Sequence, residues 1–253
     1  LFKILSFSFI PKKNIDINKD EGERLSSSLE SMGTTFIKLG QFLATRPDII
    51  GEELSKKLEN LQDKLPPFSL SKAKEIIKND LGEETLNSII DLSEPVAAAS
   101  IAQVHKAKIN DNNIIKDVAI KILRPEIKKI FNEEIDAMML FAFFVESLVK
   151  KTRRLKLVEV VFLLKEITNL EMDLRFEAAA ANEYSENTKN DVGFRVPQIY
   201  WNFTSEQVMT LDWVDGVSIR ETEELKKQNI NTNKIAEDII QHFLRHAVRD
   251  GFF

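Results

Sequence analysis

The feature that most constrains the fold is a loop of small residues, followed at a fixed distance by a strand that carries a lysine. Residues 97–104 read Ala-Ala-Ala-Ser-Ile-Ala-Gln-Val, and residues 118–121 read Val-Ala-Ile-Lys. Phosphate-binding loops of this spacing have glycine at the first, third and sixth positions. Alanine occupies all three positions here. The order favours neighbouring strands that bring the loop and Lys121 close together.

This order of loop and strand is that of the nucleotide-binding lobe of protein kinases. Alanine in the phosphate loop weakens its contacts with phosphate, because the Cβ atom disfavours positive φ and keeps the backbone farther from phosphate oxygens. We therefore expect a phosphate loop that is less mobile than its glycine counterpart. The alternative is a helix, since three consecutive alanines have a high helix propensity. Pro95 before the run and a strand pair after it favour the loop.

The composition bounds the possible functions. The chain has 253 residues and is 43% hydrophobic, which is enough for a core. Its 35 basic and 40 acidic residues make it mildly acidic, so we expect no nucleic-acid partner. It has no cysteine, which excludes thiolate metal sites. Three histidines, His105, His242 and His246, leave little material for a metal cluster, and we expect no metal ligands within this chain.

Both ends read as truncations. The chain starts at Leu1 without methionine and without the pattern of a signal peptide. It stops at two aromatic residues, Phe252 and Phe253. Since no window reaches about 18 consecutive apolar residues, we expect no membrane-spanning helix.

Hydrophobic periodicity predicts a helical first third. Apolar residues recur at helical spacing from Glu21 to Thr45, which predicts one long helix that Pro47 ends. The same period continues through residues 54–65, and Ser69 begins a helix that ends near Gly82. The first 90 residues show no strand signal.

The rest of the chain mixes strands and helices. Two β-branched runs, 101–109 and 114–123, flank a turn-forming cluster and predict an antiparallel hairpin. Residues 137–149 are apolar nearly all round, which favours burial, with a docking face as the alternative. Further predictions are a long helix over 155–188, strands over 196–203 and 207–213, and a last helix over 233–249.

In kinases, the ammonium group of the strand lysine reaches the α- and β-phosphates and is held by a carboxylate on a neighbouring helix. Carboxylates in a predicted helix are therefore the candidates for holding Lys121. Four of them crowd one stretch, namely Glu166, Glu171, Asp173 and Glu177. The alternative for this stretch is a solvated acidic face. Downstream, the backbone of residues 211–216 is placed to bind an adenine edge, or else is an ordinary strand end.

Three motifs occur in order along the chain: residues 38–41 read K-L-G-Q, residues 95–105 contain the alanine-rich loop, and residues 171–173 read E-M-D. They resemble the K-x-G-Q motif, the alanine-rich loop and the E-x-D motif of the UbiB family of atypical protein-kinase-like proteins, which is linked to ubiquinone biosynthesis. The resemblance runs from Gly33 to the last residue.

The resemblance implies that the helical extension folds over the nucleotide cleft, with Lys38, Gly40 and Gln41 as the motif residues. This occlusion would block protein substrates and favour a small-molecule or lipid-linked role with ATPase activity. Glu171 and Asp173 would contact the extension, and the roles of Glu171 and Glu177 are open to exchange.

The implied cofactor is ATP or ADP with Mg²⁺. The expected nucleotide contacts are Ala97, Ala98, Ala99, Ser100, Val104, Ala119, Lys121, Glu177, Asp212, Trp213 and Val214, with Glu177 as the ion-pair partner of Lys121. The catalytic loop and metal ligands would follow Phe253, so we expect this chain alone to be inactive. The implied partners of the complete protein are adenine nucleotide, ubiquinone-biosynthesis proteins or lipid intermediates, and the cytoplasmic face of the inner membrane.

The expected fold is α+β: a kinase-like N-lobe with an antiparallel sheet, preceded by a helical extension and followed by the start of a helical C-lobe. The corresponding domains are 1–90, 91–215 and 216–253. The alternative function is a nucleotide-sensing scaffold that docks lipid-modifying enzymes at the membrane without phosphoryl transfer. A third option, a small-molecule phosphotransferase, leaves the K-x-G-Q motif unexplained.

Overall fold

The computed structural model describes residues 21–59, 61, 66–111 and 113–252. The chain forms two compact units, and each is assembled from separate stretches of the sequence. The first unit comprises Leu1–Ser69, Ala97–Gln103 and Leu123–Met172, and the second comprises Leu70–Val96, Val104–Ile122 and Asp173–Phe253. The contiguous domains expected from the sequence stay a prediction.

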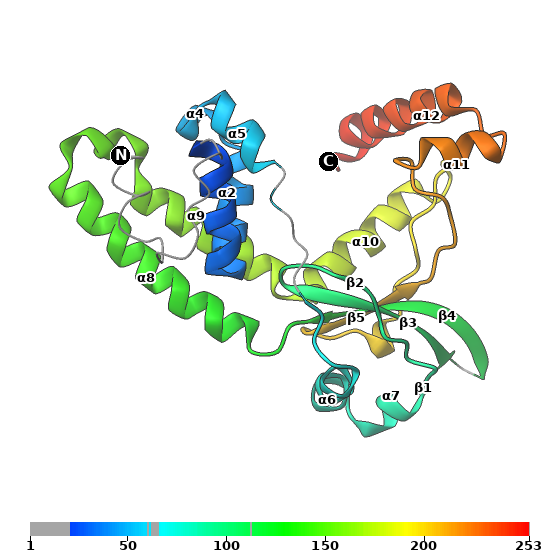
Figure 1. The fold of residues 1–253 in the computed structure, drawn as a ribbon. Coiled ribbons are helices and arrows are strands. Elements are labelled where there is room, and N and C mark those ends of the chain that lie inside the picture. The colour runs from blue at the N-terminus through cyan, green and yellow to red at the C-terminus, as the bar shows by residue number, and fades with distance from the viewer. Residues whose placement is uncertain (1–20, 60, 62–65, 112, 253) are drawn as a thin grey trace. The chain divides into compact units, whose positions relative to one another are not determined.

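Residues 21–58 of the first unit are mostly helical (Figure 1). Its helices are α2 (Glu21–Met32), α3 (Thr34–Ala44), α4 (Pro47–Ile50) and α5 (Glu52–Leu58). The single long helix expected from Glu21 to Thr45 is wrong, because Gly33 has a φ of 107° and separates α2 from α3. A continuous helix cannot include that backbone conformation.

Gly40 lets α3 pack closely against its neighbours. The small core of this part contains the buried side chains of Leu29, Leu58 and Leu61. A Cβ atom at Gly40 would overlap the Leu61 side chain and would lie 3.0 Å from Leu29. The glycine of the K-x-G-Q motif therefore allows the close packing of α3, which a larger residue would prevent.

A helical hairpin forms the C-terminal part of the first unit (Figure 1). It consists of α8 (Ile127–Leu148), the 3₁₀ helix η1 (Lys150–Leu155) and α9 (Leu157–Glu171). The expectation that residues 137–149 are buried is wrong: Phe141, Phe143 and Phe144 are 40%, 59% and 51% exposed. One face of α8 is buried through Phe131, Ile135 and Met138, whereas Phe143 and Phe144 lie on a face that stays exposed among the described residues.

An antiparallel sheet is the centre of the second unit. Its strands are β1 (Ile89–Ile90), β2 (Pro95–Ala98), β3 (Ala102–Asp111), β4 (Ile114–Leu123) and β5 (Val208–Asp212). They run in the order β1-β3-β4-β5, and β2 pairs with β3. The β3–β4 hairpin was expected. The expected strand over 196–203 is wrong, since only an isolated bridge from Ile199 to Leu211 and the 3₁₀ helix η2 (Trp201–Phe203) form there, and β1 was missed.

The two faces of this sheet differ in burial. Val118, Ile120 and Ile122 of β4 are fully buried, and they alternate with the half-buried Ala119 and Lys121 on the other face. Helices α6 (Leu70–Leu81) and α7 (Glu83–Asn87) lie on one side of the sheet, and α10 (Leu174–Thr188) lies on the other (Figure 1). The sheet therefore presents Lys121 on the side away from its aliphatic core.

The break between α9 and α10 changes where the acidic motif residues lie. The single helix expected over 155–188 is wrong, because α9 ends at Glu171 and α10 begins at Leu174. Asp173 has extended backbone (φ −127°, ψ 98°), and its carboxylate accepts a hydrogen bond from the backbone N–H of Arg175 at 3.1 Å. An N-cap of this kind starts a new helix, so Glu171 and Glu177 belong to different helices.

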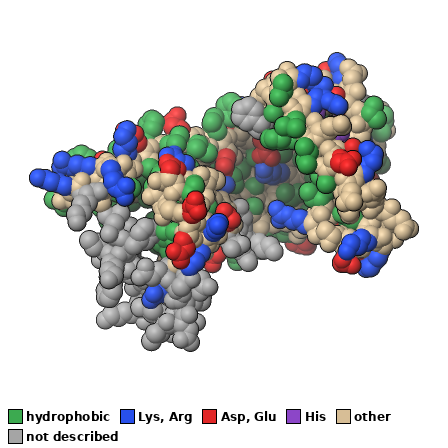
Figure 2. Space-filling model, turned by 90° about the horizontal axis from the view of Figure 1, so that it is seen from above, with side chains coloured by type: hydrophobic (Ala, Val, Ile, Leu, Met, Phe, Trp, Pro, Cys, Tyr) green, Lys and Arg blue, Asp and Glu red, His purple; other side chains and the backbone are tan. Residues whose placement is uncertain are grey.

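The C-terminal part of the second unit contains α11 (Thr222–Lys227), α12 (Thr232–Arg245) and the π-helical turn η3 (His246–Asp250). Ile239, Ile240, Phe243 and Leu244 of α12 are between 47% and 61% exposed. Figure 2 looks down from the side on which α12 lies in Figure 1, and it shows hydrophobic side chains between charged ones. Among the residues described, no helix is both long and apolar enough to span a bilayer.

We predict that Gly40→Ala lowers the free energy of unfolding by about 1–3 kcal/mol, because the added methyl group forces Leu61 and Leu29 to move in a packed core. Urea unfolding followed by circular dichroism measures the effect. Gly216→Ala is the control, since no atom lies within 4 Å of a Cβ at that position. Equal stability of the two variants would contradict the close packing of α3.

Candidate nucleotide-binding site

Lys121 of β4 forms an ion pair with Glu177 of α10 within the second unit. Its Nζ lies 2.6 Å from Oε2 and 2.8 Å from Oε1 of Glu177, so both carboxylate oxygens accept a hydrogen bond. The side chains are 25% and 50% exposed. A pair this exposed stabilises the fold by no more than about 1 kcal/mol. Its main effect is to fix the position of the ammonium group at the surface of the sheet.

Glu171 has a different partner, which lies in the first unit. The Nζ of Lys38 on α3 is 2.7 Å from Oε2 of Glu171 at the end of α9. The motif lysine is thus held to the first acidic residue of the E-x-D motif. Of the two assignments left open by the sequence, the structure pairs Glu177 with Lys121 and Glu171 with Lys38.

Asp173, the second acidic residue of the motif, has a structural task. Besides capping α10, its carboxylate accepts hydrogen bonds from the Arg175 guanidinium, with Nη2 to Oδ2 at 2.7 Å and Nε to Oδ1 at 2.9 Å. This hydrogen bond raises the pKa of Arg175 above its ordinary value. Arg175 was not singled out in the sequence, although its position directly inside the helix start is a usable signal.

The alanine-rich segment is not helical. Ala97 and Ala98 end strand β2, and the backbone N–H of Ala99 donates to the carbonyl of Ala102 at 2.8 Å, which closes a tight turn into β3. Among the described residues, non-glycine positive φ values occur elsewhere and not in this turn. The expectation that alanine excludes the left-handed backbone of glycine loops agrees with this geometry.

Arg124 holds the turn in place, although no motif in the sequence indicates this role. Its Nε and Nη2 donate to the carbonyl of Ala99 at 3.0 and 2.8 Å, and its backbone N–H donates to the carbonyl of Ile101 at 2.8 Å. The side chain of Gln103 adds two hydrogen bonds to the backbone of Phe68, at 3.0 and 3.1 Å. The turn is therefore fixed by side chains of the first unit.

The backbone that is expected from the sequence to contact adenine begins with Asp212, the last residue of β5. The carboxylate of Asp212 accepts hydrogen bonds from Tyr200 Oη at 2.6 Å, Arg195 Nη2 at 2.7 Å and the backbone N–H of Gln198 at 3.2 Å. Burial alone would raise the pKa of Asp212, but these hydrogen bonds together outweigh it and lower the pKa. The Asp212 side chain is thus a structural anchor.

Val214 differs from Asp212, because it is 61% exposed. Within the part of the chain that the structure describes, its backbone N–H and C=O have no hydrogen-bond partner. Trp213, between the two, donates its backbone N–H to the carbonyl of Asp117 at 3.1 Å. The backbone N–H and C=O of Val214 are therefore available to a ligand, as far as the described residues show.

Val104 and Ala119 complete the residues expected near the nucleotide. Ala119 lies opposite Leu211 in the β4–β5 register and Lys121 lies opposite Met209, so these side chains share one face of the sheet. Val104 is half-buried between fully buried neighbours on β3. The small side chain at position 119 leaves room on that face.

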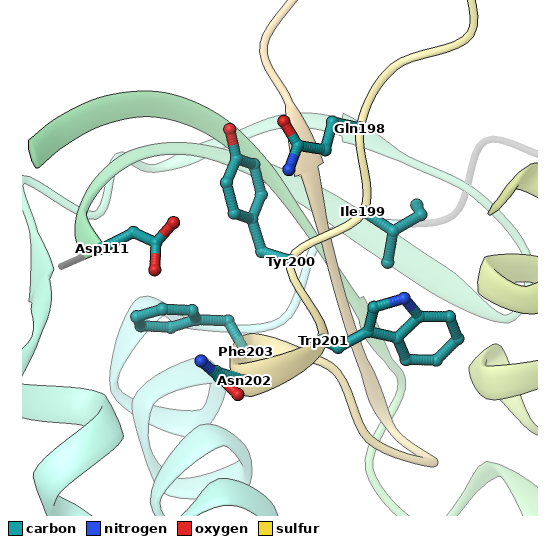
Figure 3. Close-up of a pocket in the computed structure, with 7 residues that line it drawn as sticks. All are labelled: Asp111, Gln198, Ile199, Tyr200, Trp201, Asn202 and Phe203. Carbon is teal, nitrogen blue, oxygen red and sulfur yellow. The ribbon is translucent and has the colours of Figure 1, made fainter. Parts of the chain in front are cut away.

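A separate pocket of about 240 Å³ lies elsewhere in the second unit (Figure 3). It is lined by Asp111, Gln198, Ile199, Tyr200, Trp201, Asn202 and Phe203. None of these residues is among the expected nucleotide contacts. Burial raises the pKa of Tyr200, and so does its hydrogen bond to Asp212. The sequence carried no motif that would have indicated this pocket.

Comparison with known proteins gives consistent matches. Residues 60–253 match the family of the ABC1 atypical kinase-like domain. The chain is 34% identical over 233 residues to a "Probable protein kinase UbiB" of Marinobacter nauticus, covering 92% of this chain and 42% of that protein. It is 32% identical over 251 residues to the protein of the same name in Pseudomonas fluorescens, covering 98% of this chain and 46% of that protein.

The chain therefore spans less than half the length of these relatives. Among solved structures, it resembles one titled "The complex structure of Rv3197-erythromycin from Mycobacterium tuberculosis" at 27% identity and a TM-score of 0.48. That match covers 72% of this chain and 45% of the other.

The anchoring role of Asp212 predicts a pH-dependent contribution to stability. Because folding lowers the pKa of Asp212, its stabilisation is present above the ordinary carboxyl pKa of about 4 and is lost as the pH falls through the lowered pKa. We expect Asp212→Asn to be less stable than the parent by about 1–3 kcal/mol near neutral pH, with a difference that shrinks toward pH 2. Urea unfolding at several pH values measures this, and a difference independent of pH would refute it.

Proposed function

The chain belongs to the ABC1 atypical kinase-like family, and on that premise we propose that it is the nucleotide-binding part of an atypical kinase or ATPase that supports ubiquinone biosynthesis. The single observation that carries the nucleotide-binding proposal is the ion pair between Lys121 and Glu177. In protein kinases, a strand lysine held by a helix glutamate binds the nucleotide phosphates. The residue types, the elements that carry them and the spacing from the alanine-rich turn all agree with that role.

The chain's own groups fit an adenine nucleotide. Lys121 supplies a fixed positive charge for the α- and β-phosphates, and the unpaired backbone groups of Val214 suit the adenine edge. Ala119 keeps the sheet face between them free of a large side chain. We propose ATP or ADP as the ligand, together with Mg²⁺, whose ligands we expect beyond Phe253 by resemblance to the family.

The K-x-G-Q motif is the basis for proposing that protein substrates are excluded. Lys38 is held by Glu171 and Gly40 is required for packing, so the motif helix α3 is a rigid part of the first unit. By resemblance to the family, we propose that this motif helix, with Gln41, restricts the substrates of the nucleotide-binding part and excludes protein substrates. The proposed partners are therefore lipid intermediates or proteins of ubiquinone biosynthesis at the cytoplasmic face of the inner membrane.

The test compares Lys121→Met with the parent in the complete gene product. We expect the Kd for ATP and ADP with Mg²⁺ to rise about 10- to 100-fold and hydrolysis to be lost, because a charged hydrogen bond contributes about 1.5–3 kcal/mol. Lys108→Met is the matched control, since Lys108 is an exposed lysine on β3, 4.0 Å from Asp91. Isothermal calorimetry and phosphate release are the measurements. Equal nucleotide affinity and hydrolysis in parent and Lys121→Met would end the proposal.

A second candidate function is a scaffold that docks on the membrane, and the α8–α9 hairpin favours it. Phe143 and Phe144 on α8, and Phe162 and Leu170 on α9, are each more than half exposed. The turn η1 between the helices exposes basic side chains at Lys150, Arg153 and Arg154. Exposed aromatic residues beside basic ones are typical of segments that lie on anionic lipid surfaces.

An open apolar groove of about 430 Å³ lies on the same hairpin. Met139, Leu140, Phe143 and Val158 line it together with Asp136. Among the described residues, Leu140 and Phe143 in this groove are 58% and 59% exposed, and we propose that they contact lipid chains. The scaffold proposal assigns the hairpin this docking role while nucleotide acts only as a signal.

Vesicle sedimentation tests the docking role. We expect Phe143→Asp combined with Phe144→Asp to weaken binding to vesicles of phosphatidylcholine and phosphatidylglycerol by at least about tenfold, because each buried Phe contributes about 1.5–3 kcal/mol. Ile219→Asp, at a residue 62% exposed in the second unit, is the control. Arg153→Glu with Arg154→Glu should weaken binding only when phosphatidylglycerol is present. Binding that both double variants leave unchanged would exclude the hairpin as the docking surface.

A further inference from the structure

Two of the three histidines meet an aspartate in the second unit. His242 on α12 and His246 at the start of η3 are four residues apart, so one helical turn brings both rings to the same side. Asp191 comes from the turn that follows α10, and its backbone N–H donates to Thr188. One ligating atom from each of the three side chains lies within 4.8 Å of the others.

The imidazole ring of His246 is buried and fixed by hydrogen bonds, as the ring of a metal-binding histidine usually is. Its side chain is 1% exposed and that of Asp191 is 7% exposed. Its Nε2 lies 2.9 Å from Oδ2 of Asp191, and its Nδ1 lies 2.6 Å from Oη of Tyr184. Metal-binding histidines commonly have their second nitrogen fixed by an oxygen, which sets the ring orientation. Tyr184 supplies that oxygen here.

His242 has an unsatisfied polar atom. Its Nδ1 is buried, and among the residues that the structure describes it has no hydrogen-bond partner. A buried polar atom without a partner costs about 1–3 kcal/mol. The ring lies between Phe194, at 5.3 Å between ring centroids, and His246, at 5.6 Å. Phe194 has no polar atom in its ring, and both ring nitrogens of His246 already have oxygen partners.

We propose that Asp191, His242 and His246 bind a divalent transition-metal ion such as Zn²⁺ or Co²⁺. Two imidazoles and one carboxylate form a donor set that these ions accept, with further positions left for water. When His246 Nε2 binds the ion, Nδ1 carries the proton and donates to Tyr184. The proposed site departs from the expectation that this chain holds no metal ligands, because the fold brings Asp191 beside two histidines that follow it by 51 and 55 positions.

Arginines compete with the ion for Asp191. Arg249 donates to both oxygens of Asp191 at 2.9 Å, and Arg245 lies 3.6 Å from Oδ1. The charge of Arg249 is shared with Asp250, to which it donates at 2.7 Å. A bound ion and the Arg249 guanidinium would share one carboxylate, so removal of the Arg249 charge should tighten metal binding. A purely structural hydrogen-bond network gives no such prediction.

The test uses the full 253-residue chain without an affinity tag, freed of metal by a chelator. We expect one Co²⁺ ion per chain, detected by visible absorption, and Zn²⁺ to displace it. His242→Ala and Asp191→Asn should each weaken binding at least about tenfold, while Gln241→Ala, at an exposed neighbour on α12, should not. Arg249→Gln should strengthen binding. Excess Mg²⁺ should leave the Co²⁺ spectrum unchanged, since Mg²⁺ prefers oxygen ligands.

Three outcomes would overturn the site. One is the absence of saturable Co²⁺ binding in a chain whose circular dichroism is native. Another is equal Co²⁺ affinity in the parent and in His242→Ala. The third is an affinity that Arg249→Gln leaves unchanged or lowers, because the guanidinium and the ion would then not share Asp191.

Discussion

The ion pair between Lys121 and Glu177 connects strand β4 to helix α10. The position of the Lys121 ammonium group on the partly exposed face of the sheet depends on this pair. Without Glu177, the Lys121 ammonium would be free to extend into solvent, since its neighbours Val118, Ile120 and Ile122 all face the opposite side. The pair adds little to the free energy of folding because it is partly exposed. It acts by placing one positive charge at a defined point, which is what binding of a phosphate requires.

The break in the chain at Asp173 makes that arrangement possible. On one straight helix, Glu171 and Glu177 would point about 120° apart and would be carried by the same rigid body. The N-cap at Asp173 starts a new helix instead, so Glu171 binds Lys38 in the first unit while Glu177 binds Lys121 in the second. One short acidic stretch thus supplies a partner to each of the two lysines that the motifs single out.

Sequence patterns that involve only neighbouring residues predicted individual helices and strands well. The β3–β4 hairpin and helix α6 were expected within a few residues, because alternating β-branched residues and a helical apolar period are read directly from neighbours. The two long helices were wrong, since the apolar period continues through Gly33 and Met172 although the backbone does not. The exposure of Phe143 and Phe144 was also missed, because an apolar segment does not indicate whether another helix will cover it.

The sequence by itself determined the family and the alanine-rich turn, and it singled out Lys121 as the candidate phosphate-binding residue, because these depend on residue types at fixed spacing. Only the tertiary structure decided which glutamate holds Lys121, that Arg124 fixes the turn, and that His242 and His246 meet Asp191. Such contacts join residues that are distant along the chain. Their formation depends on how helices and strands pack, and no local pattern of residues carries that information.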